Sequence, residues 1–333
     1  MEKQEAEKEK HSRDDALKVN GVSVSYREHC VLKKIDFEVK EGEIFGIIGM
    51  SGSGKTTLLT TLIGAIRPDS GEVLFKSNRV LEGEKFQSVL KNQFAIRNLV
   101  GFAAQRPSFY HELTVMQNLE YFGALYDLPK ELAKENIKRA LRLVGLSGFE
   151  NLAGKFLSGG MQKKLDIACA LIHNPSILIL DEPTADLDPI TRSDLIKLFR
   201  RINKEGKTII IASHFLSELE YLCDRIAILN EGVIAEIGTI EELSKSLTGN
   251  KEIHLQTANG KYNLIIEKLK KVKMVEISHV VDRGQKLVIY TPEAEAVLHH
   301  LLQAVRDSDD SIVNVNVARP SLNEVFKRVV KKK

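Results

Sequence analysis

Residues 43–56 read EIFGIIGMSGSGKT and determine the fold of the chain. Residues 44–48 form a short, nearly continuous apolar run, which is typical of a parallel strand buried on both faces. Residues 49–56 fit the pattern G-x-x-x-x-G-K-[ST], and a helical stretch follows at residues 57–66. The glycines let the backbone curl so that successive N–H groups point inward, and the helix adds its positive N-terminal end. This strand–loop–helix order predicts a phosphate-binding loop.

Two side chains of this loop have separate expected tasks. Lys55 is expected to reach the β- and γ-phosphates of a nucleotide, and Thr56 to offer its hydroxyl to Mg²⁺. ATP and Mg²⁺ are therefore the expected ligands. The nucleotide-binding residues predicted in the loop are Gly49, Ser51, Gly52, Ser53, Gly54, Lys55, Thr56 and Thr57.

A second apolar strand ends in two carboxylates, because residues 177–182 read ILILDE. Asp181 is expected at the C-terminal edge of a parallel sheet, where nucleotide sites form, and can hold a metal through water. Glu182 follows directly and is placed to orient or deprotonate an attacking water. The alternative is a strand that merely ends in a turn with exposed carboxylates. The phosphate-binding loop elsewhere in the chain favours the catalytic interpretation.

Composition excludes several classes of protein. Lys and Arg number 48 and Asp and Glu 45, so the net charge is only +3, and aromatic residues make up 6% with no Trp. A surface built to bind nucleic acid is more basic and richer in stacking rings, so no nucleic-acid partner is expected. The apolar runs are far shorter than the ~20 residues needed to cross a bilayer. The first residues lack a signal-peptide core, and three widely spaced cysteines favour a reducing compartment. These features predict a cytoplasmic protein.

The 333 residues suggest two domains, and the apolar pattern places them. Residues 1–15 carry ten charges and are expected to be a disordered tail. Residues 16–240 are expected to form an α/β domain, with a helical subdomain at about 106–151. Residues 250–330 follow the order βαββαβ, which predicts a small α+β domain with a ferredoxin-like fold. The polar stretch at residues 76–98 is interpreted as a surface excursion of unknown role.

The segment LSGGMQ at residues 157–162 precedes a helix that Ser158 is expected to cap. A phosphate-binding loop, an LSGG segment and an ILDEP strand end, in this order, resemble the nucleotide-binding subunits of ABC (ATP-binding cassette) transporters. The resemblance covers about residues 17–238. It implies a P-loop NTPase cassette with a RecA-like core, an antiparallel β subdomain and an inserted α-helical subdomain.

Further residues match motif positions of that family, and their roles are implied by the resemblance. Tyr26 matches the aromatic residue that stacks on adenine, and Gln105 matches the glutamine that contacts the metal and the attacking water. His214 matches the histidine that senses the γ-phosphate, and Asp188 matches the position that meets the opposite subunit. The implied catalytic residues are Glu182, His214 and Gln105, and the implied Mg²⁺ ligands are Thr56, Gln105 and, through water, Asp181.

The resemblance also implies partners. In the family, ATP lies between the phosphate-binding loop of one subunit and the LSGG segment of another, and this chain has one copy of each. Ser158, Gly159 and Gly160 are therefore expected to complete the site of a second ATP-binding subunit, in a homodimer or a heterodimer. Separate transmembrane permease subunits are expected to hold the protein at the inner face of the cell membrane.

One departure from the commonest motif and one further match refine the expected function. Met161 replaces Gln after LSGG, and residues 319–326 read RPSLNEVF; both resemble ATPases of ABC-2-type exporters, which include multidrug and drug-resistance proteins. Three alternatives stay open: an uptake-type transporter ATPase, a non-transport ABC ATPase acting on ribosomes or nucleic acid, and a regulatory module that hydrolyses little ATP. The single cassette without a long heptad insertion argues against the second, and the presence of Glu182 and His214 against the third.

Overall fold

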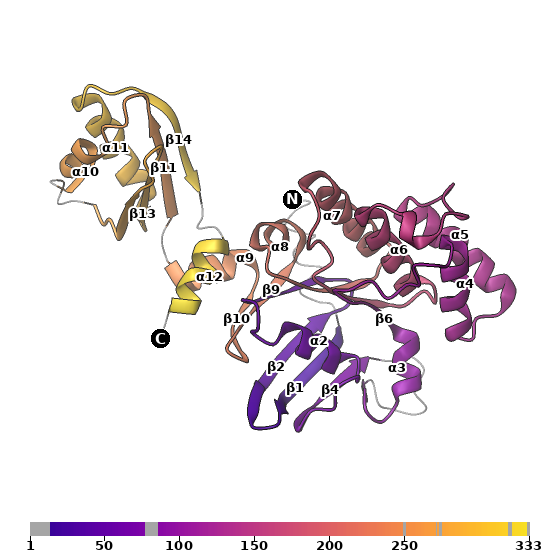
Figure 1. Ribbon diagram of the computed structural model, residues 1–333. Helices are drawn as coiled ribbons and strands as arrows, with labels where there is room; N and C mark the ends of the chain where they lie inside the picture. Colours follow the sequence, from indigo (N-terminus) through magenta and orange to yellow (C-terminus); the bar gives the residue numbers. More distant parts are fainter. Residues whose placement is uncertain are drawn as a thin grey trace. The chain divides into compact units, whose positions relative to one another are not determined.

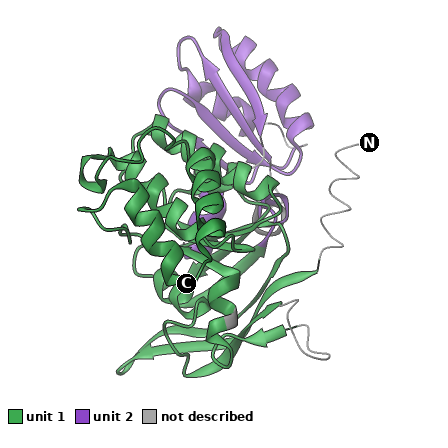
Figure 2. Ribbon diagram, turned by 90° about the vertical axis from the view of Figure 1, so that its right-hand side faces the viewer, with its two compact units in different colours: residues 1–237 green, residues 238–333 purple. Residues whose placement is uncertain are grey.

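The computed structural model divides into two compact units, one ending at Ile237 and the other beginning at Gly238, each with its own hydrophobic core (Figures 1 and 2). Most of the predicted tail (residues 1–13), the middle of the polar stretch (77–85) and residues 319–321 lie outside the described residues. Within the described part of the chain, no helix is both long enough and apolar enough to cross a membrane. The described residues are 14–76, 86–248, 251–270, 272, 275–318 and 322–331.

The centre of unit 1 is a six-stranded sheet in the order β10-β9-β3-β8-β7-β6. The pairs from β9 to β6 are all parallel, and every residue of β3, β7 and β8 is buried. Strands covered on both faces need apolar side chains at every position, which explains the continuous apolar runs in the sequence. The strands are β3 (Ile44–Ile48), β6 (Val100–Ala103), β7 (Ile177–Asp181), β8 (Thr208–Ser213), β9 (Arg225–Asn230) and β10 (Val233–Gly238).

A second sheet of unit 1 is antiparallel, with the strand order β2-β1-β4-β5. Helix α2 (Lys55–Leu62) lies between the two sheets, and its Leu58 and Leu59 belong to the shared core (Figure 1). Phe37 of β2 stacks on Phe45 of β3 with ring centroids 5.4 Å apart, so the sheets are also joined directly. The strands are β1 (Asp15–Tyr26), β2 (His29–Lys40), β4 (Ser70–Lys76) and β5 (Phe86–Ser88).

The polar stretch is not wholly a surface excursion, which corrects the interpretation of residues 76–98. Its second half forms β5 and helix α3 (Gln93–Leu99), and Val89 and Ile96 are buried in the core of unit 1. The apolar residues of this half are scattered among Lys, Gln and Asn and give no clear period. Only packing against the two sheets reveals them as core residues.

Five α-helices complete the described part of unit 1 beyond α2 and α3. Helix α4 begins with a capping box, in which Thr114 Oγ1 accepts from the backbone N–H of Gln117 and Gln117 Oε1 accepts from that of Thr114. Helices α7 and α8 lie on the face of the six-stranded sheet opposite α2 (Figure 1). Helices α4 (Val115–Leu125) and α5 (Lys130–Val144) pack on each other and on α6 (Gly159–Leu171). Helices α7 and α8 span Pro189–Lys204 and Leu216–Leu222.

Unit 2 has the predicted ferredoxin-like arrangement. Its antiparallel sheet has the order β12-β13-β11-β14, which is the strand order of a βαββαβ chain folded in this way. Helices α10 and α11 pack together over a core that includes Ile253, Tyr262 and Leu301. Two further helices, α9 (Ile240–Thr248) and α12 (Leu322–Lys331), pack on each other. The remaining elements are β11 (Lys251–Thr257), α10 (Tyr262–Lys270), β12 (His279–Asp282), β13 (Leu287–Thr291), α11 (Ala294–Asp307) and β14 (Ile312–Ala318).

His173 joins the end of α6 to the edge strand β6. Its Nε2 lies 3.2 Å from the carbonyl oxygen of Val100, and its ring stacks on Tyr126 with centroids 3.7 Å apart. Because the carbonyl can only accept, Nε2 carries the proton of the neutral ring. Burial lowers the pKa of His173 from 6.5 to about 4. Between about pH 4 and 6.5, the folded state therefore binds fewer protons at His173 than the unfolded state does.

We predict that His173 makes the protein less stable as the pH falls from about 6.5 to 4. The unfolded chain takes up a proton that the folded ring excludes, and this linkage amounts to at most about 3 kcal/mol. His173→Gln keeps a donor for the carbonyl of Val100 but does not titrate. It therefore removes the contribution of His173 to the change of the free energy of unfolding with pH. Urea unfolding of both proteins between pH 4 and 7 measures the difference. His299→Gln, at an exposed position of α11, is the control; equal slopes for wild type and His173→Gln contradict the prediction.

Candidate functional site

Three strand ends meet at one edge of the six-stranded sheet. The parallel register sets Ile48 beside Ser213 and Asp181 beside Ala212. The loop after β3, the carboxylates at the end of β7 and the residue after β8 therefore converge, as the carboxyl ends of parallel strands do. They surround a cavity of about 480 Å³. Its lining residues are Val31, Ser51, Gly52, Gly54, Lys55, Thr56, Thr57, Gln105, Glu182 and His214.

The loop at residues 49–56 is shaped by its glycines. Gly54 has a φ of 104° at the N-terminal boundary of α2, a conformation that disfavours residues with a β-carbon. A β-carbon on Gly49 would lie 2.3 Å from Ser53 Oγ and 2.5 Å from the carbonyl oxygen of Leu229. Among the described side chains none caps α2, and its first turn has no acidic residue. The N–H groups at this helix end are left for an anionic ligand.

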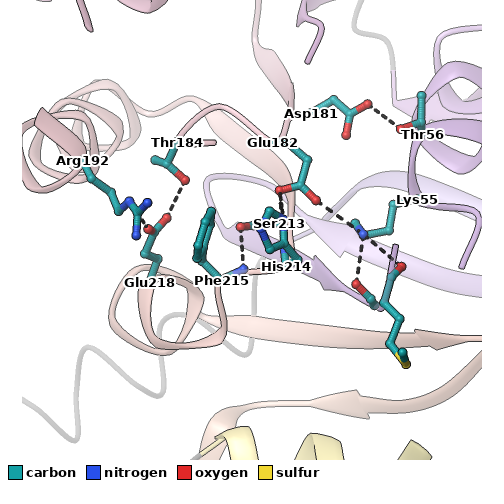
Figure 3. A network of polar contacts seen from close by, with 12 residues as sticks. Lys55, Thr56, Asp181, Glu182, Thr184, Arg192, Ser213, His214, Phe215 and Glu218 are labelled. Carbon is teal, nitrogen blue, oxygen red and sulfur yellow. Dashed lines mark hydrogen bonds and ion pairs between the residues drawn. The ribbon is translucent and has the colours of Figure 1, made fainter. Parts of the chain in front are cut away.

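Lys55 is a buried cation held by oxygen atoms, with 7% of its surface exposed. Its Nζ donates to the carbonyl oxygens of Gly49 at 2.9 Å and Met50 at 3.3 Å. It also lies 3.4 Å from Glu182 Oε1, as Figure 3 shows. The ion pair offsets the cost of burying both charges and places the ammonium group at the cavity wall.

Thr56 and Asp181 form the part of the site suited to a metal. Thr56 Oγ1 donates to Asp181 Oδ2 at 2.8 Å (Figure 3). Asp181 Oδ1 is buried without a hydrogen-bond partner among the described protein atoms. Burial raises the pKa of Asp181, although the bond from Thr56 opposes this effect. A carboxylate oxygen that lacks a protein donor, beside a hydroxyl group, fits a hard divalent cation or its bound water.

Glu182 and His214 form a close pair across two strands. His214 Nδ1 lies 2.7 Å from Glu182 Oε2, and the backbone N–H of His214 donates to the same oxygen at 3.3 Å (Figure 3). Glu182 has a φ of 47° and donates its own N–H to the carbonyl of Ala212. Left-handed backbone at a residue with a β-carbon is uncommon and concentrates at functional sites. The sequence carried no signal of this conformation.

Helix α6 holds the segment that carries Gln105. Lys163 Nζ donates to the carbonyl oxygen of Gln105 at 2.6 Å, and Asp166 Oδ1 accepts from the backbone N–H of Ser108 at 2.7 Å. Burial raises the pKa of Asp166 to about 6 and lowers the pKa of Lys163. Sequence analysis missed both residues, because they look like ordinary polar positions of a helix.

Several predicted residues lie elsewhere on unit 1. Tyr26 is 49% exposed at the end of β1. Ser158 caps α6, with its Oγ accepting from the N–H of Met161 at 3.4 Å, and Asp188 caps α7 by accepting from the N–H groups of Ile190 and Thr191. Hydrogen bonds from Thr191 lower the pKa of Asp188. Five predicted residues do not line the cavity: Tyr26, Ser158, Gly159, Gly160 and Asp188. Three more lie in the loop or strand ends around the cavity but do not line it either: Gly49, Ser53 and Asp181.

Comparison with known proteins identifies the family. The family model described as ABC transporter matches residues 32–185, and the model of the DrrA1-3-like ATP-binding protein C-terminal domain matches residues 238–330. The linearmycin resistance ATP-binding protein LnrL of Bacillus subtilis is 30% identical over 93% of this chain and 96% of its own length. The chain belongs to the ATP-binding subunits of ABC transporters. The daunorubicin resistance ATP-binding protein DrrA3 of Streptomyces coeruleorubidus is also 30% identical, over 94% of this chain and 95% of its own.

Solved structures of ABC cassettes share the fold. One is cbiO1 from Clostridium perfringens, with a TM-score of 0.62 and 28% identity over 78% of this chain and 96% of that one. Another is the dimeric cassette MJ0796 in a post-hydrolysis state with ADP and Pi, with a TM-score of 0.58 and 27% identity over 67% and 98%. The predicted P-loop NTPase cassette is thereby confirmed. As an ABC subunit, the protein binds and hydrolyses ATP; ATP-binding subunits of this family dimerise and work with transmembrane permease subunits.

We predict that Gly49→Ala lowers ATP affinity about tenfold or more. The added methyl group forces the loop away from the carbonyl oxygen of Leu229, so the loop N–H groups no longer point at the phosphates. Equilibrium binding of a fluorescent ATP analogue measures the change. Gly123→Ala is the matched control, because Gly123 lies in helix α4 and the nearest atom to the added methyl group is Ala133 Cβ at 3.7 Å, an ordinary contact distance. Wild-type affinity in Gly49→Ala contradicts the assignment of this loop to the nucleotide.

Proposed function

We propose that this subunit powers the export of a drug-like compound through an ABC-2-type permease, from the cytoplasmic face of the membrane. The proposal rests on the resistance functions in the names of LnrL and DrrA3. This chain matches both proteins over nearly their whole length. The match of residues 238–330 to the DrrA-like C-terminal domain supports it, because this second unit is shared with a drug-resistance ATPase family.

One observation carries the catalytic part of the proposal. A single cavity gathers Lys55, Thr56, Glu182 and His214, whereas the LSGG residues of the same chain take no part in lining it. The chain thus has half of a composite site. We infer that Ser158, Gly159 and Gly160 of a second subunit supply the other half, with Asp188 at the interface. ATP bound between two surfaces rich in N–H donors holds them together, and hydrolysis releases them.

Within this half-site each residue has a proposed task. The loop N–H groups and Lys55 bind the phosphates, and Tyr26 stacks on adenine. Glu182 orients the attacking water and accepts its proton, while His214 holds the carboxylate through Nδ1 and meets the γ-phosphate. Arrival of the γ-phosphate draws Lys55 away from Glu182, which strengthens the carboxylate as a base.

Thr56, Gln105 and Asp181 are the residues that would hold Mg²⁺. The bound cation would neutralise the phosphate charge during transfer. The unpaired oxygen of Asp181 and the hydroxyl of Thr56 support this assignment. Gln105 lines the same cavity, and its backbone is fixed by Lys163.

We predict that Glu182→Gln lowers kcat about 100- to 10,000-fold while ATP binding persists, since the amide fills the same space but accepts no proton. ATP added to the variant accumulates a closed dimer, detected by size-exclusion chromatography. Steady-state phosphate release gives kcat. Wild-type turnover in Glu182→Gln would show that this carboxylate is not the base.

Export is tested in the native host. Cells that carry Glu182→Gln in place of wild type are expected to become as sensitive to antibiotics as a deletion strain, because transport stops without hydrolysis. The measurement is the inhibitory concentration of each antibiotic in a panel that includes daunorubicin and linearmycin. The same variant is expected to co-purify from membranes with a polytopic subunit. Unchanged resistance together with co-sedimentation on ribosomes overturns the proposal.

A further inference from the structure

A buried polar network lies beside the catalytic pair and takes no part in the chemistry proposed above (Figure 3). Its centre is Glu218 of α8, which is 7% exposed. Glu218 Oε2 accepts from Thr184 Oγ1 at 2.5 Å, and Thr184 follows Glu182 by two residues. Glu218 Oε1 lies 2.9 Å from Arg192 Nε on α7. One carboxylate therefore connects the end of β7, the start of α7 and helix α8.

Arg192 extends this network in two directions. Its Nη2 donates to the carbonyl oxygen of Leu187 at 3.1 Å, in the loop that leads to Asp188. Its guanidinium carbon lies 4.1 Å from the ring centroid of Phe215, a cation–π contact. Asp188 caps α7, so the loop and the first turn of this helix are held together.

The other end of the network is the catalytic pair. The rings of Phe215 and His214 have centroids 4.1 Å apart, and the N–H of Phe215 donates to Ser213 Oγ at 3.0 Å. His214 in turn holds Glu182 at 2.7 Å. A continuous series of contacts runs from the Asp188 loop through Arg192, Glu218 and Phe215 to the carboxylate that orients water.

Stability alone is a poor explanation for this arrangement. An ion pair gains little over apolar residues of the same size when its charges lose their hydration, as the buried carboxylate of Glu218 does. Here the two residues hold two points of the segment between β7 and α7: Glu218 Oε2 accepts from the hydroxyl of Thr184, and Arg192 Nη2 donates to the carbonyl of Leu187. An apolar pair could fill the space but could not fix the carbonyl of Leu187 and the hydroxyl of Thr184 together.

We propose that Arg192 and Glu218 are positioning residues that hold His214 against Glu182 and connect this pair to the loop carrying Asp188. The inference rests on the proposed function, in which Asp188 lies at the subunit interface. Closure of the dimer at that loop then sets the position of the water-orienting carboxylate. The contribution is to the hydrolytic step and not to the binding of ATP.

The experiment is a double-mutant cycle on the full chain. Glu218→Gln keeps an acceptor for Thr184 but removes the negative charge. Arg192→Lys keeps the positive charge but loses the planar guanidinium group with its fixed donors. We expect each to lower kcat about 10- to 100-fold, as a small misplacement of a catalytic group does, with KM for ATP changed less than about twofold. The double variant is expected to be no slower than the slower single variant, because both act through one unit.

The controls separate positioning from folding. Arg97 and Asp127 form an exposed ion pair of 3.1 Å elsewhere in unit 1, so Arg97→Lys and Asp127→Asn are expected to keep wild-type kcat. Unchanged kcat in Glu218→Gln or Arg192→Lys overturns the inference, as do losses that multiply in the double variant. A raised KM, or a loss of kcat that follows a lowered unfolding temperature, assigns the pair a purely structural role. Turnover by Glu182→Gln, by contrast, tests the proposed function itself.

Discussion

The parallel register of β3, β8 and β7 is the constraint on which the site depends. These strands are buried on both faces, so their order and register are set by apolar packing and not by the polar residues at their ends. Because all three run in the same direction, the phosphate-binding loop, Glu182 and His214 emerge at one edge. The polar chemistry is thus concentrated where the apolar core stops.

The charges at that edge compensate one another. Lys55 and Glu182 are both nearly excluded from solvent, and each would be costly to bury alone. Their 3.4 Å contact gives each charge a partner of opposite sign within the chain. A phosphate that attracts Lys55 changes the surroundings of Glu182 at the same moment. In the proposed function, binding and activation are coupled through the ammonium group of Lys55.

The contacts that surround the site come from helices on the far side of the sheet from α2. Lys163 and Asp166 of α6 fix the backbone around Gln105, and Arg192 and Glu218 of α7 and α8 connect the loops on either side of the catalytic pair. These four charged residues are buried or half-buried, and each connects a helix to a segment beside the site.

The sequence by itself determined the loop at residues 49–56, the strand end at Glu182, the cassette fold and the ferredoxin-like order of the second unit. The loop, the strand end and the order of the second unit are encoded by local spacing, namely glycines at fixed intervals, apolar runs, and periods of two or 3.6 residues, whereas the cassette fold followed from the resemblance of the motifs to a known family. Tertiary structure alone decided that Val89 and Ile96 are core residues, that Glu182 takes a left-handed backbone, and that Arg192 meets Glu218. Each of these depends on contacts between residues distant in the chain, and a single polar or apolar residue carries no local signal of its distant partner.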